Sequence, residues 1–430
     1  MSDRPRPEVR TLADIPGTPD APDPLHDWLR AFNTGFYRSA EVSAEETERR
    51  RGGTDPERTQ GAYDGGRCVA TFRTTPQRLT VPGGAALPSC AVTNVAVAPT
   101  HRRRGLLTEM MANGLAAARE RGDAFASLVS AEYPIYGRHG FGAATWTTEW
   151  EVEVARAGLD RRYSGPADDG DGGRVELLDA AAYREAAAGA HERFRAQPQR
   201  QGAIDRTDRW WRIFTGALRF PGDGYDSPFF AVYRDADGEP QGAVAYTVDS
   251  RWESKQPQQT ATVDDLFATT PAGERALWRY VLAMDWVLKV RTGPRAPDDI
   301  LPLLLPDPRA ARVLTHADFL WLRPLDVPAM LEARTYAVSG TLVLELRDKA
   351  GLAGGRYRLE AGPDGTACRT TRDEPGLSMD IGELGALYLG DESAVRLAAL
   401  GRIAEHREGA AARADTLFRT ARRPWCPDMF

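Results

Sequence analysis

The chain has 430 residues, more than one hydrophobic core usually accommodates, and this length predicts two or three domains. With 42% hydrophobic and 27% charged residues, it has the composition of a folded soluble protein. Its net charge of −6 argues against nucleic-acid binding, because a nucleic-acid-binding protein needs a basic face to neutralise phosphates. The chain shows neither an apolar secretory signal nor an apolar run of about 18 residues, so we expect a cytoplasmic protein without a membrane span.

The first third of the chain alternates helical and strand-like patterns. Ser43 and Glu46 form a capping box before a charged helix, and Gly122 ends an amphipathic helix. In chain order we expect an edge strand at 7–12, helices at 23–37 and 43–51, strands at 68–76 and 90–99, a helix at 104–121, a strand at 124–130 and one long strand at 142–154.

Two further segments follow a Gly-, Asp- and Arg-rich stretch at 158–173, which is typical of a linker. The second segment is predicted to hold a helix at 179–194 and a strand pair at 229–248 that turns at an Asp-Gly pair. The third holds a helix at 326–337, strands at 340–348 and 354–362, and two late helices. The predicted domains are therefore 1–157, 158–318 and 319–430.

The four cysteines are scattered along the chain, with no Cys-x-x-Cys pair and no neighbouring histidine cluster. Their spacing predicts neither a disulfide framework nor a metal site, and buried free thiols are favoured. The residues are Cys68, Cys90, Cys368 and Cys426.

One internal similarity relates the first two segments. VAVAPTHRRRGLL at 95–107 aligns without a gap on LFATTPAGERALW at 266–278, a constant shift of 171 positions. Each copy has a strand, a turn with threonine and proline, and the start of a helix. We interpret this as two copies of one αβ domain; coincidence stays open, because strand–turn–helix is a common pattern.

The segment 95–107 has the features of a phosphate-binding turn. Pro99 ends the strand, and a helix is expected to begin near Arg103 to Gly105. The first turn of a helix leaves backbone N–H groups without partners at its partly positive end, which attracts anions. Gly105 permits close approach of a phosphate, while Arg102, Arg103 and Arg104 supply positive charge. The alternative is a solvated basic turn before an amphipathic helix.

This turn resembles the pyrophosphate loop of the GNAT acetyltransferases, Arg/Gln-x-x-Gly-x-Gly/Ala, although Leu107 replaces the small final residue. The resemblance implies that acetyl-coenzyme A is the cofactor. The strand from Asn94 to Val97 would pair with its pantetheine arm. The implied cofactor contacts are Val95, Ala96, Val97, Arg102, Arg103, Arg104, Gly105 and Leu106.

A closer resemblance covers nearly the whole chain. The motifs at 95–107, 135–145, 320–337 and 387–390 together resemble the Eis (enhanced intracellular survival) family of acetyltransferases. The implied fold is α/β (α+β), with two tandem GNAT-like domains and a C-terminal sterol-carrier-protein-like α+β domain. The family also implies a homo-oligomer, a hexamer.

The resemblance assigns catalytic roles to Tyr136 and Phe430. The tyrosine of the IYGRHGFG motif is the family's general acid, here Tyr136, and Tyr133 is its nearest rival. The family's general base is the carboxylate of the last residue, here Phe430. An α-carboxylate with a pKa of roughly 3.3–3.7 is ionised at neutral pH and accepts protons. The family has an acidic residue beside the terminal phenylalanine, whereas here Met429 stands there and Asp428 precedes it.

The expected substrates are small polycationic amines such as aminoglycosides, acetylated at more than one position. The implied pocket residues are Phe36, Asn94, Trp210 and Asp307. Two alternatives remain: acetylation of lysines in proteins or peptides, and a non-catalytic lipid carrier or interaction protein. In the second copy, Ala276 aligns with Gly105 and Glu274 with Arg103. An acidic residue there would repel phosphate, so the central domain is predicted to bind no coenzyme A.

Overall fold

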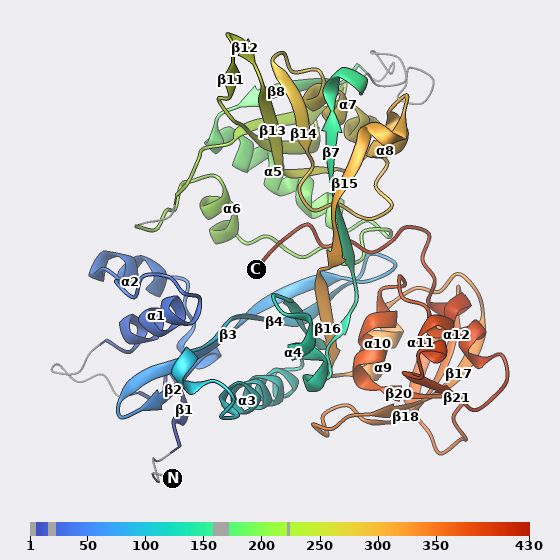
Figure 1. Ribbon diagram of the computed structural model, residues 1–430. Coiled ribbons are helices and arrows are strands. Elements are labelled where there is room, and N and C mark those ends of the chain that lie inside the picture. Colours follow the sequence, from blue (N-terminus) through green and yellow to red (C-terminus); the bar gives the residue numbers. More distant parts are fainter. Residues whose placement is uncertain (1–5, 16–22, 158–171, 222–223) are drawn as a thin grey trace.

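The computed structural model describes residues 6–15, 23–157, 172–221 and 224–430. Figure 1 shows two mixed αβ parts, one above the other, and a third part beside the lower one. The predicted linker at 158–173 lies almost entirely outside the described residues. Within the described ranges, no helix has the length and apolar character that a membrane crossing requires.

The first sheet has the strand order β1-β2-β3-β4-β5-β16-β6. Asp23 caps α1, and the Ser43 hydroxyl accepts a hydrogen bond from the Glu46 amide at the start of α2, as the capping box predicted. The apolar stripe of α3 packs against this sheet. The elements are β1 (Glu8–Thr11), α1 (Pro24–Gly35), α2 (Ala44–Arg51), β2 (Thr59–Asp64), β3 (Arg67–Thr80), β4 (Ala86–Val97), α3 (Leu106–Glu120), β5 (Phe125–Val129), α4 (Tyr133–Tyr136), β6 (Gly142–Ala143) and β16 (Leu320–Pro324).

The second sheet has the order β15-β7-β14-β13-β10-β9-β8. Its helices begin at capping residues that the sequence supplies, such as Asp179 before α5 and Thr270 before α7. The elements are β7 (Trp146–Glu153), β8 (Arg174–Leu178), α5 (Ala180–Arg195), α6 (Asp208–Phe214), β9 (Phe229–Arg234), β10 (Pro240–Val248), β13 (Gln259–Ala268), α7 (Pro271–Leu282), β14 (Val287–Arg291), α8 (Leu301–Leu304) and β15 (Ala311–Asp318), with a small pair β11 (Trp252–Glu253) and β12 (Gln256–Pro257) outside the sheet.

The two sheets exchange strands, and the single strand predicted at 142–154 was wrong. The chain leaves the first sheet after β6 and enters the second as β7; β15 and β16 make the reverse crossing. At the crossing the Leu320 amide donates to the Thr145 hydroxyl at 3.0 Å, and the Phe319 amide donates to the Thr145 carbonyl at 3.0 Å. The boundaries placed after residues 157 and 318 therefore do not separate the sheets. The strand pattern runs on through the bend, so no local signal marks it.

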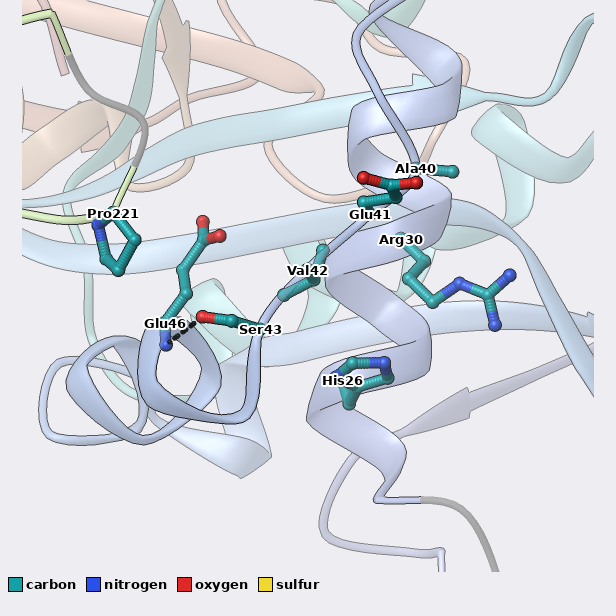
Figure 2. A pocket seen from close by; sticks show the side chains of 8 residues that line it. All are labelled: His26, Arg30, Ala40, Glu41, Val42, Ser43, Glu46 and Pro221. Atoms are coloured by element: carbon teal, nitrogen blue, oxygen red, sulfur yellow. Dashed lines mark hydrogen bonds between the residues drawn. The ribbon is translucent and has the colours of Figure 1, made fainter.

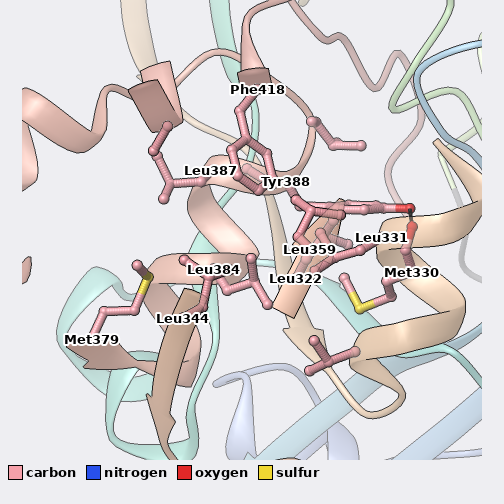
Figure 3. Close-up of a cluster of buried hydrophobic side chains, with 14 of the residues drawn as sticks. Leu322, Met330, Leu331, Leu344, Leu359, Met379, Leu384, Leu387, Tyr388 and Phe418 are labelled. Atoms are coloured by element: carbon pink, nitrogen blue, oxygen red, sulfur yellow. Dashed lines mark hydrogen bonds between the residues drawn. The ribbon is translucent and has the colours of Figure 1, made fainter. Parts of the chain in front are cut away.

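The third sheet, β19-β18-β17-β20-β21, packs against helices that reach the first sheet. Figure 3 shows Leu322 of β16 in the same core as Leu344, Leu384 and Tyr388. Gly385 lies directly on the Leu322 carbonyl, where a Cβ would come within 2.3 Å. The elements are α9 (Val327–Ala333), β17 (Gly340–Arg347), β18 (Gly355–Gly362), β19 (Gly365–Thr370), β20 (Leu377–Asp380), α10 (Ile381–Tyr388), α11 (Ala394–Ala399), β21 (Ile403–Glu405) and α12 (Ala410–Phe418).

Two helical predictions for this part differ from the structure. The helix expected at 326–337 ends at Ala333, because the Arg334 side chain turns inward and donates to the carbonyls of Tyr388 and Phe418. Instead of the two late helices expected, the described residues form three, α10, α11 and α12. The four cysteines are buried free thiols, as their spacing predicted.

Candidate active site

The central strands of the first sheet separate at their C-terminal ends. β4 pairs with β5 in parallel from Ser89 to Ala91, and β4 then continues to Val97 without β5 beside it. A bulge with Asn94 in left-handed conformation (φ 52°) bends the strand, and the Asn94 carbonyl accepts from the Thr71 hydroxyl at 2.9 Å. The edge at Val95 to Val97 is therefore open to a ligand that can pair with backbone groups, as the pantetheine prediction required.

The loop from Ala98 to Gly105 ends this open edge and leads into α3. His101 Nε2 lies 3.0 Å from Asp64 Oδ2, which anchors the start of the loop. Arg103 (φ 64°) and Gly105 (φ 81°) are left-handed, and α3 starts at Leu106 without a side-chain cap. Uncapped N–H groups at a helix N-terminus form an anion site, so the backbone suits a pyrophosphate.

The three arginines of this loop are exposed, and none forms an ion pair with a described residue. Arg102 lies 5.5 Å over the Tyr37 ring, and its Nε donates to the Val97 carbonyl at 3.3 Å. Arg104 donates to the Thr100 carbonyl at 3.2 Å. Positive charge that has no local carboxylate is free to bind an anionic ligand. The loop thus fits the pyrophosphate of coenzyme A, and the open edge fits its pantetheine arm.

Two of the predicted cofactor residues have side chains that pack against other parts of the protein. The Leu106 side chain is buried in the core under α3, so only its N–H is available to a ligand. Ala96 packs against Gly35 of α1, where a Cβ on the glycine would come within 2.5 Å of the alanine Cβ. This close packing holds the end of α1 against the open strand.

Tyr136 ends the short helix α4 that follows β5, and it belongs to the same core as Leu106. The residue is 8% exposed, and its ring lies edge-on to Phe141 at 6.2 Å. Its hydroxyl makes no hydrogen bond to any other residue in the described ranges. Burial raises the pKa of Tyr136, and the nearby Glu132 raises it further, so the phenol stays protonated at neutral pH.

Tyr133 occupies a different environment from Tyr136. It is 53% exposed and lies edge-on to Trp321 at 5.0 Å. A proton donor for a thiolate must lie inside the cleft, and of the two tyrosines Tyr136 is the buried one. The structure therefore favours Tyr136 over its rival as an acid.

The end of the chain returns to the region between the first and second sheets (Figure 1). Phe430 is half-buried and packs against the core cluster that contains Leu79, Phe319 and Cys426. Two residues earlier, Asp428 is buried and accepts from Arg206 Nε at 2.9 Å. These contacts hold the terminus, which does not fray as an unanchored end would.

Three predicted pocket residues lie near these elements, and the fourth does not. Phe36 is exposed at the end of α1 beside Tyr37, Asn94 lies in the β4 bulge, and the Trp210 ring lies 4.1 Å from the Arg206 guanidinium carbon. Asp307 instead pairs with Arg156 at 3.0 Å. That pair lies beyond the far end of β7, about 26 Å from the strand's first residue at ~3.3 Å per residue. Asp307 precedes β15 and lies in this ion pair, apart from the other three predicted pocket residues.

A buried charge cluster at the tail was missed by sequence reasoning. Arg206 makes two hydrogen bonds to Asp265, of 2.7 and 2.9 Å, besides the one to Asp428. The three residues are far apart in sequence and belong to no motif. No local signal could have identified them.

Figure 2 shows a separate hollow, beside α1 and the start of α2. Its wall includes Arg30, Glu41, Glu46 and Pro221. It contains none of the loop arginines, Tyr136 or the chain end. None of its residues belongs to the open strand edge or to the loop that precedes α3, so we do not assign the chemistry to it.

In the second copy the loop is absent. α7 begins at Pro271, soon after β13 ends at Ala268, and the Thr270 hydroxyl accepts from the Gly273 amide at 3.1 Å. The residues aligned with the arginine loop are thus wound into a capped helix. Glu274 is buried in the first turn of α7, 3.8 Å from Arg295. The alignment with Arg103 suggested that Glu274 would line an open loop, but it does not.

Comparison with known proteins fits this geometry. Residues 21–144 and 202–324 each match the family described as acetyltransferase (GNAT) domain, and 327–427 match the sterol carrier protein domain. N-acetyltransferase Eis of Mycobacterium tuberculosis is 35% identical over 351 residues, covering 80% of this chain and 81% of that one. The chain belongs to the Eis family. Two GNAT domains and a sterol-carrier-protein-like domain confirm the predicted fold and the duplication.

Other relatives agree with this assignment. The crystal structure of Eis1 from Mycobacterium abscessus superposes with a TM-score of 0.82 at 32% identity, covering 98% of this chain and all of that one. An uncharacterized N-acetyltransferase of Streptomyces avermitilis is 60% identical over 419 residues, 97% of this chain and 99% of that protein. The chain is thus an N-acetyltransferase of the GNAT type, and enzymes of this type in general use acetyl-coenzyme A.

Proposed function

We propose that this chain transfers the acetyl group of acetyl-coenzyme A to amines of small polycationic molecules such as aminoglycosides, at more than one position. One observation carries the proposal. The open strand edge, the uncapped arginine loop and the free hydroxyl of Tyr136 belong to elements that meet around one gap in the first sheet.

The cofactor site divides into two parts. The edge at Val95 to Val97 offers backbone groups to the pantetheine arm, and the N-terminus of α3 with Arg102, Arg103 and Arg104 offers positive charge to the phosphates. When bound, acetyl-coenzyme A supplies a thioester whose acetyl carbon an amine can attack. Tyr136 then donates its proton to the departing sulfur, a task for which its raised pKa keeps it protonated.

The proton of the attacking amine goes to the carboxylate of Phe430. An ionised carboxylate can only accept a proton, and the contacts of Asp428 and of the Phe430 side chain anchor the end of the chain that carries it. Phe36 is exposed at the end of α1 and presents an aromatic side chain that suits a cationic substrate, whereas the Trp210 ring already packs against the Arg206 guanidinium and Phe214. The net charge of −6 also favours cations over anions.

The carrier alternative receives little support from the third part. Its core is filled by its own side chains: Leu344, Leu384 and Tyr388 are buried in one cluster, and the Tyr388 hydroxyl donates to the Met330 carbonyl at 2.8 Å (Figure 3). A lipid would have to displace this packing.

The test is thiol release from acetyl-coenzyme A with an aminoglycoside, compared with a lysine peptide of equal charge. We expect release with the aminoglycoside and acetylated products of more than one mass. Release only with the peptide would favour protein lysines instead. No release with any amine, together with a change in stability on delipidation, would support the carrier alternative.

We also propose that the chain forms a homo-oligomer, a hexamer as in the family it resembles. The edge strand β15 supports association, because Val313 and Leu314 are exposed along it and an open strand edge invites pairing. Light scattering on the purified chain tests this, and a monomeric mass would contradict it.

A further inference from the structure

The last residues of the chain are seated on the second sheet. Arg422 Nε donates to Asp298 Oδ2 at 2.9 Å, and the Arg422 carbonyl accepts from Gln201 Nε2 at 2.6 Å. The Trp425 amide donates to the Gln201 carbonyl at 3.0 Å. Gly202, at φ 97°, lies against the Trp425 backbone, where a Cβ would come within 2.9 Å. We call residues 422–430 the tail.

In the second copy, the tail lies at the strand edge that corresponds to the open edge of β4 in the first copy. β13 pairs with β14 from Gln259 to Thr262 and then continues to Ala268 without β14 beside it, just as β4 continues without β5. Here Arg295 and Arg200 fill the open edge: their side chains donate to the carbonyls of Leu266 and Ala268. The Trp425 ring covers the Arg295 guanidinium at 4.6 Å. The duplicated gap therefore holds side chains of the protein and one residue of the tail.

The most buried contact of the tail lies two residues from its end. The Arg206 side chain is 1% exposed, and its guanidinium carbon lies 4.1 Å from the centre of the Trp210 ring. Its two bonds to Asp265 and its single bond to Asp428 fix the guanidinium between β13 and the tail. Burial raises the pKa of Asp428 to about 6, while Arg206 opposes this shift, so the pair is ionised at neutral pH.

We infer that Arg206 is a positioning residue, which holds Asp428 and thereby fixes the place of the Phe430 carboxylate. The inference rests on the proposed role of that carboxylate as base. Two residues span at most about 7 Å of extended chain, so an anchored Asp428 confines the terminus to a small volume. A misplacement of only ~1 Å can cost a catalytic group about 10²-fold in rate.

The test is Asp428→Asn in the full chain. Asparagine keeps an oxygen for Arg206, whose charge remains neutralised by Asp265, so the fold is expected to persist; near-ultraviolet circular dichroism at the assay temperature checks this. We expect kcat to fall by about 10- to 100-fold, with the KM for acetyl-coenzyme A within about twofold of the wild-type value, because the loop and strand edge are untouched. Arg206→Lys keeps the positive charge, and its kcat should lie between those of the wild type and Asp428→Asn.

The matched control is Arg423→Gln. It removes another ion pair of the tail, Arg423 to Asp391, but one that is partly exposed and seven residues from the end. We expect wild-type kcat from this variant. An equal loss of kcat in Arg423→Gln would overturn the inference, because loosening the tail at any point would then lower kcat and Arg206 would have no special role.

A second readout does not depend on activity. Cys426 is buried, and its Sγ donates to the Asp428 carbonyl at 3.3 Å. In native labelling with a maleimide, mapped by mass spectrometry, Asp428→Asn should react at Cys426 about tenfold faster than wild type, since a released tail exposes the thiol. Labelling at the wild-type rate, or faster labelling with unchanged kcat, would overturn the inference.

The proposed base is checked separately by adding two glycines after Phe430. If this extension lowers kcat and Asp428→Asn lowers it no further in the extended chain, both variants act through the same carboxylate. If the extended chain keeps full activity, the base is wrong, while Cys426 labelling still reports whether Arg206 seats the tail.

Discussion

The two strand–turn–helix copies, β4 to α3 and β13 to α7, have related sequences and different environments. In the first, Val95 to Val97 and the start of α3 have unsatisfied backbone groups and three arginines beside them. In the second, arginine side chains satisfy the strand carbonyls, and Thr270 caps the helix. An open strand edge thus remains only in the first copy, where the protein leaves its own backbone unpaired, and the filled second copy instead contacts the tail.

The largest effect is expected from extending the chain beyond Phe430. A peptide bond to a further residue converts the Phe430 carboxylate into an amide, which cannot accept the proton. Activity should therefore fall by about 10³-fold, the usual contribution of a general base. The measurement is kcat for aminoglycoside acetylation, with circular dichroism confirming the fold. Full activity in a chain with a C-terminal tag would contradict the role of the terminus.

Tyr136→Phe should lower kcat by about 10²-fold, because the thiolate then leaves without a proton. The affinity for coenzyme A should stay unchanged, since the pyrophosphate loop is not altered. Tyr133→Phe serves as the control and should behave as wild type, because Tyr133 is exposed at the outer end of α4. The reverse result would assign the acid role to Tyr133.

Gly105→Val tests whether the first copy binds the cofactor through its left-handed loop. Space is not the difficulty, since only Arg6 comes within 3.5 Å of a Cβ there, but φ is 81°. That conformation costs a residue with a side chain roughly 1–2 kcal/mol, so the Kd for coenzyme A by calorimetry should rise about tenfold. Ala276→Gly, at the aligned position of the second copy, should leave Kd unchanged even as it weakens α7.

Arg103→Glu gives the first copy the charge that Glu274 has in the second. We expect a Kd for coenzyme A only about threefold to fivefold higher, because exposed charge pairs contribute about 1 kcal/mol or less. The effect should shrink in 0.5 M salt. Arg119→Glu, near the other end of α3, is the control. An equal rise in Kd there would mean that the charge at position 103 acts only through the overall electrostatic field of the protein.

The pH profile gives the smallest effect. Because burial and Glu132 raise the pKa of Tyr136, its donating form persists as pH rises and is lost only above the ordinary tyrosine range near 10. The kcat of wild type should therefore show no alkaline decline up to about pH 9.5. A decline with a midpoint near pH 8 would show that another group is the acid.

Much of the local structure followed from the sequence. The capping residue Ser43, the helix of α3 and the strand at 90–99 were predicted because each depends on neighbours within a few positions. The strand exchange at Thr145 was not, because the strand pattern continues across the bend and the partner, Leu320, is far along the chain.

The sequence by itself determined the chemistry of one loop and the family of the chain. The arginines, Gly105 and the motif around Tyr136 are short-range patterns, and their backbone requirements can be inferred from a few adjacent residues. Only the tertiary structure decided which of the residues singled out in the sequence lie near one another. In that structure Asp307 pairs with Arg156 beyond the end of β7, while Arg206, Asp265 and Asp428 form one buried cluster. The physical reason is that a buried charge is stable only beside its partners, and which partners these are depends on how distant strands and the tail pack together.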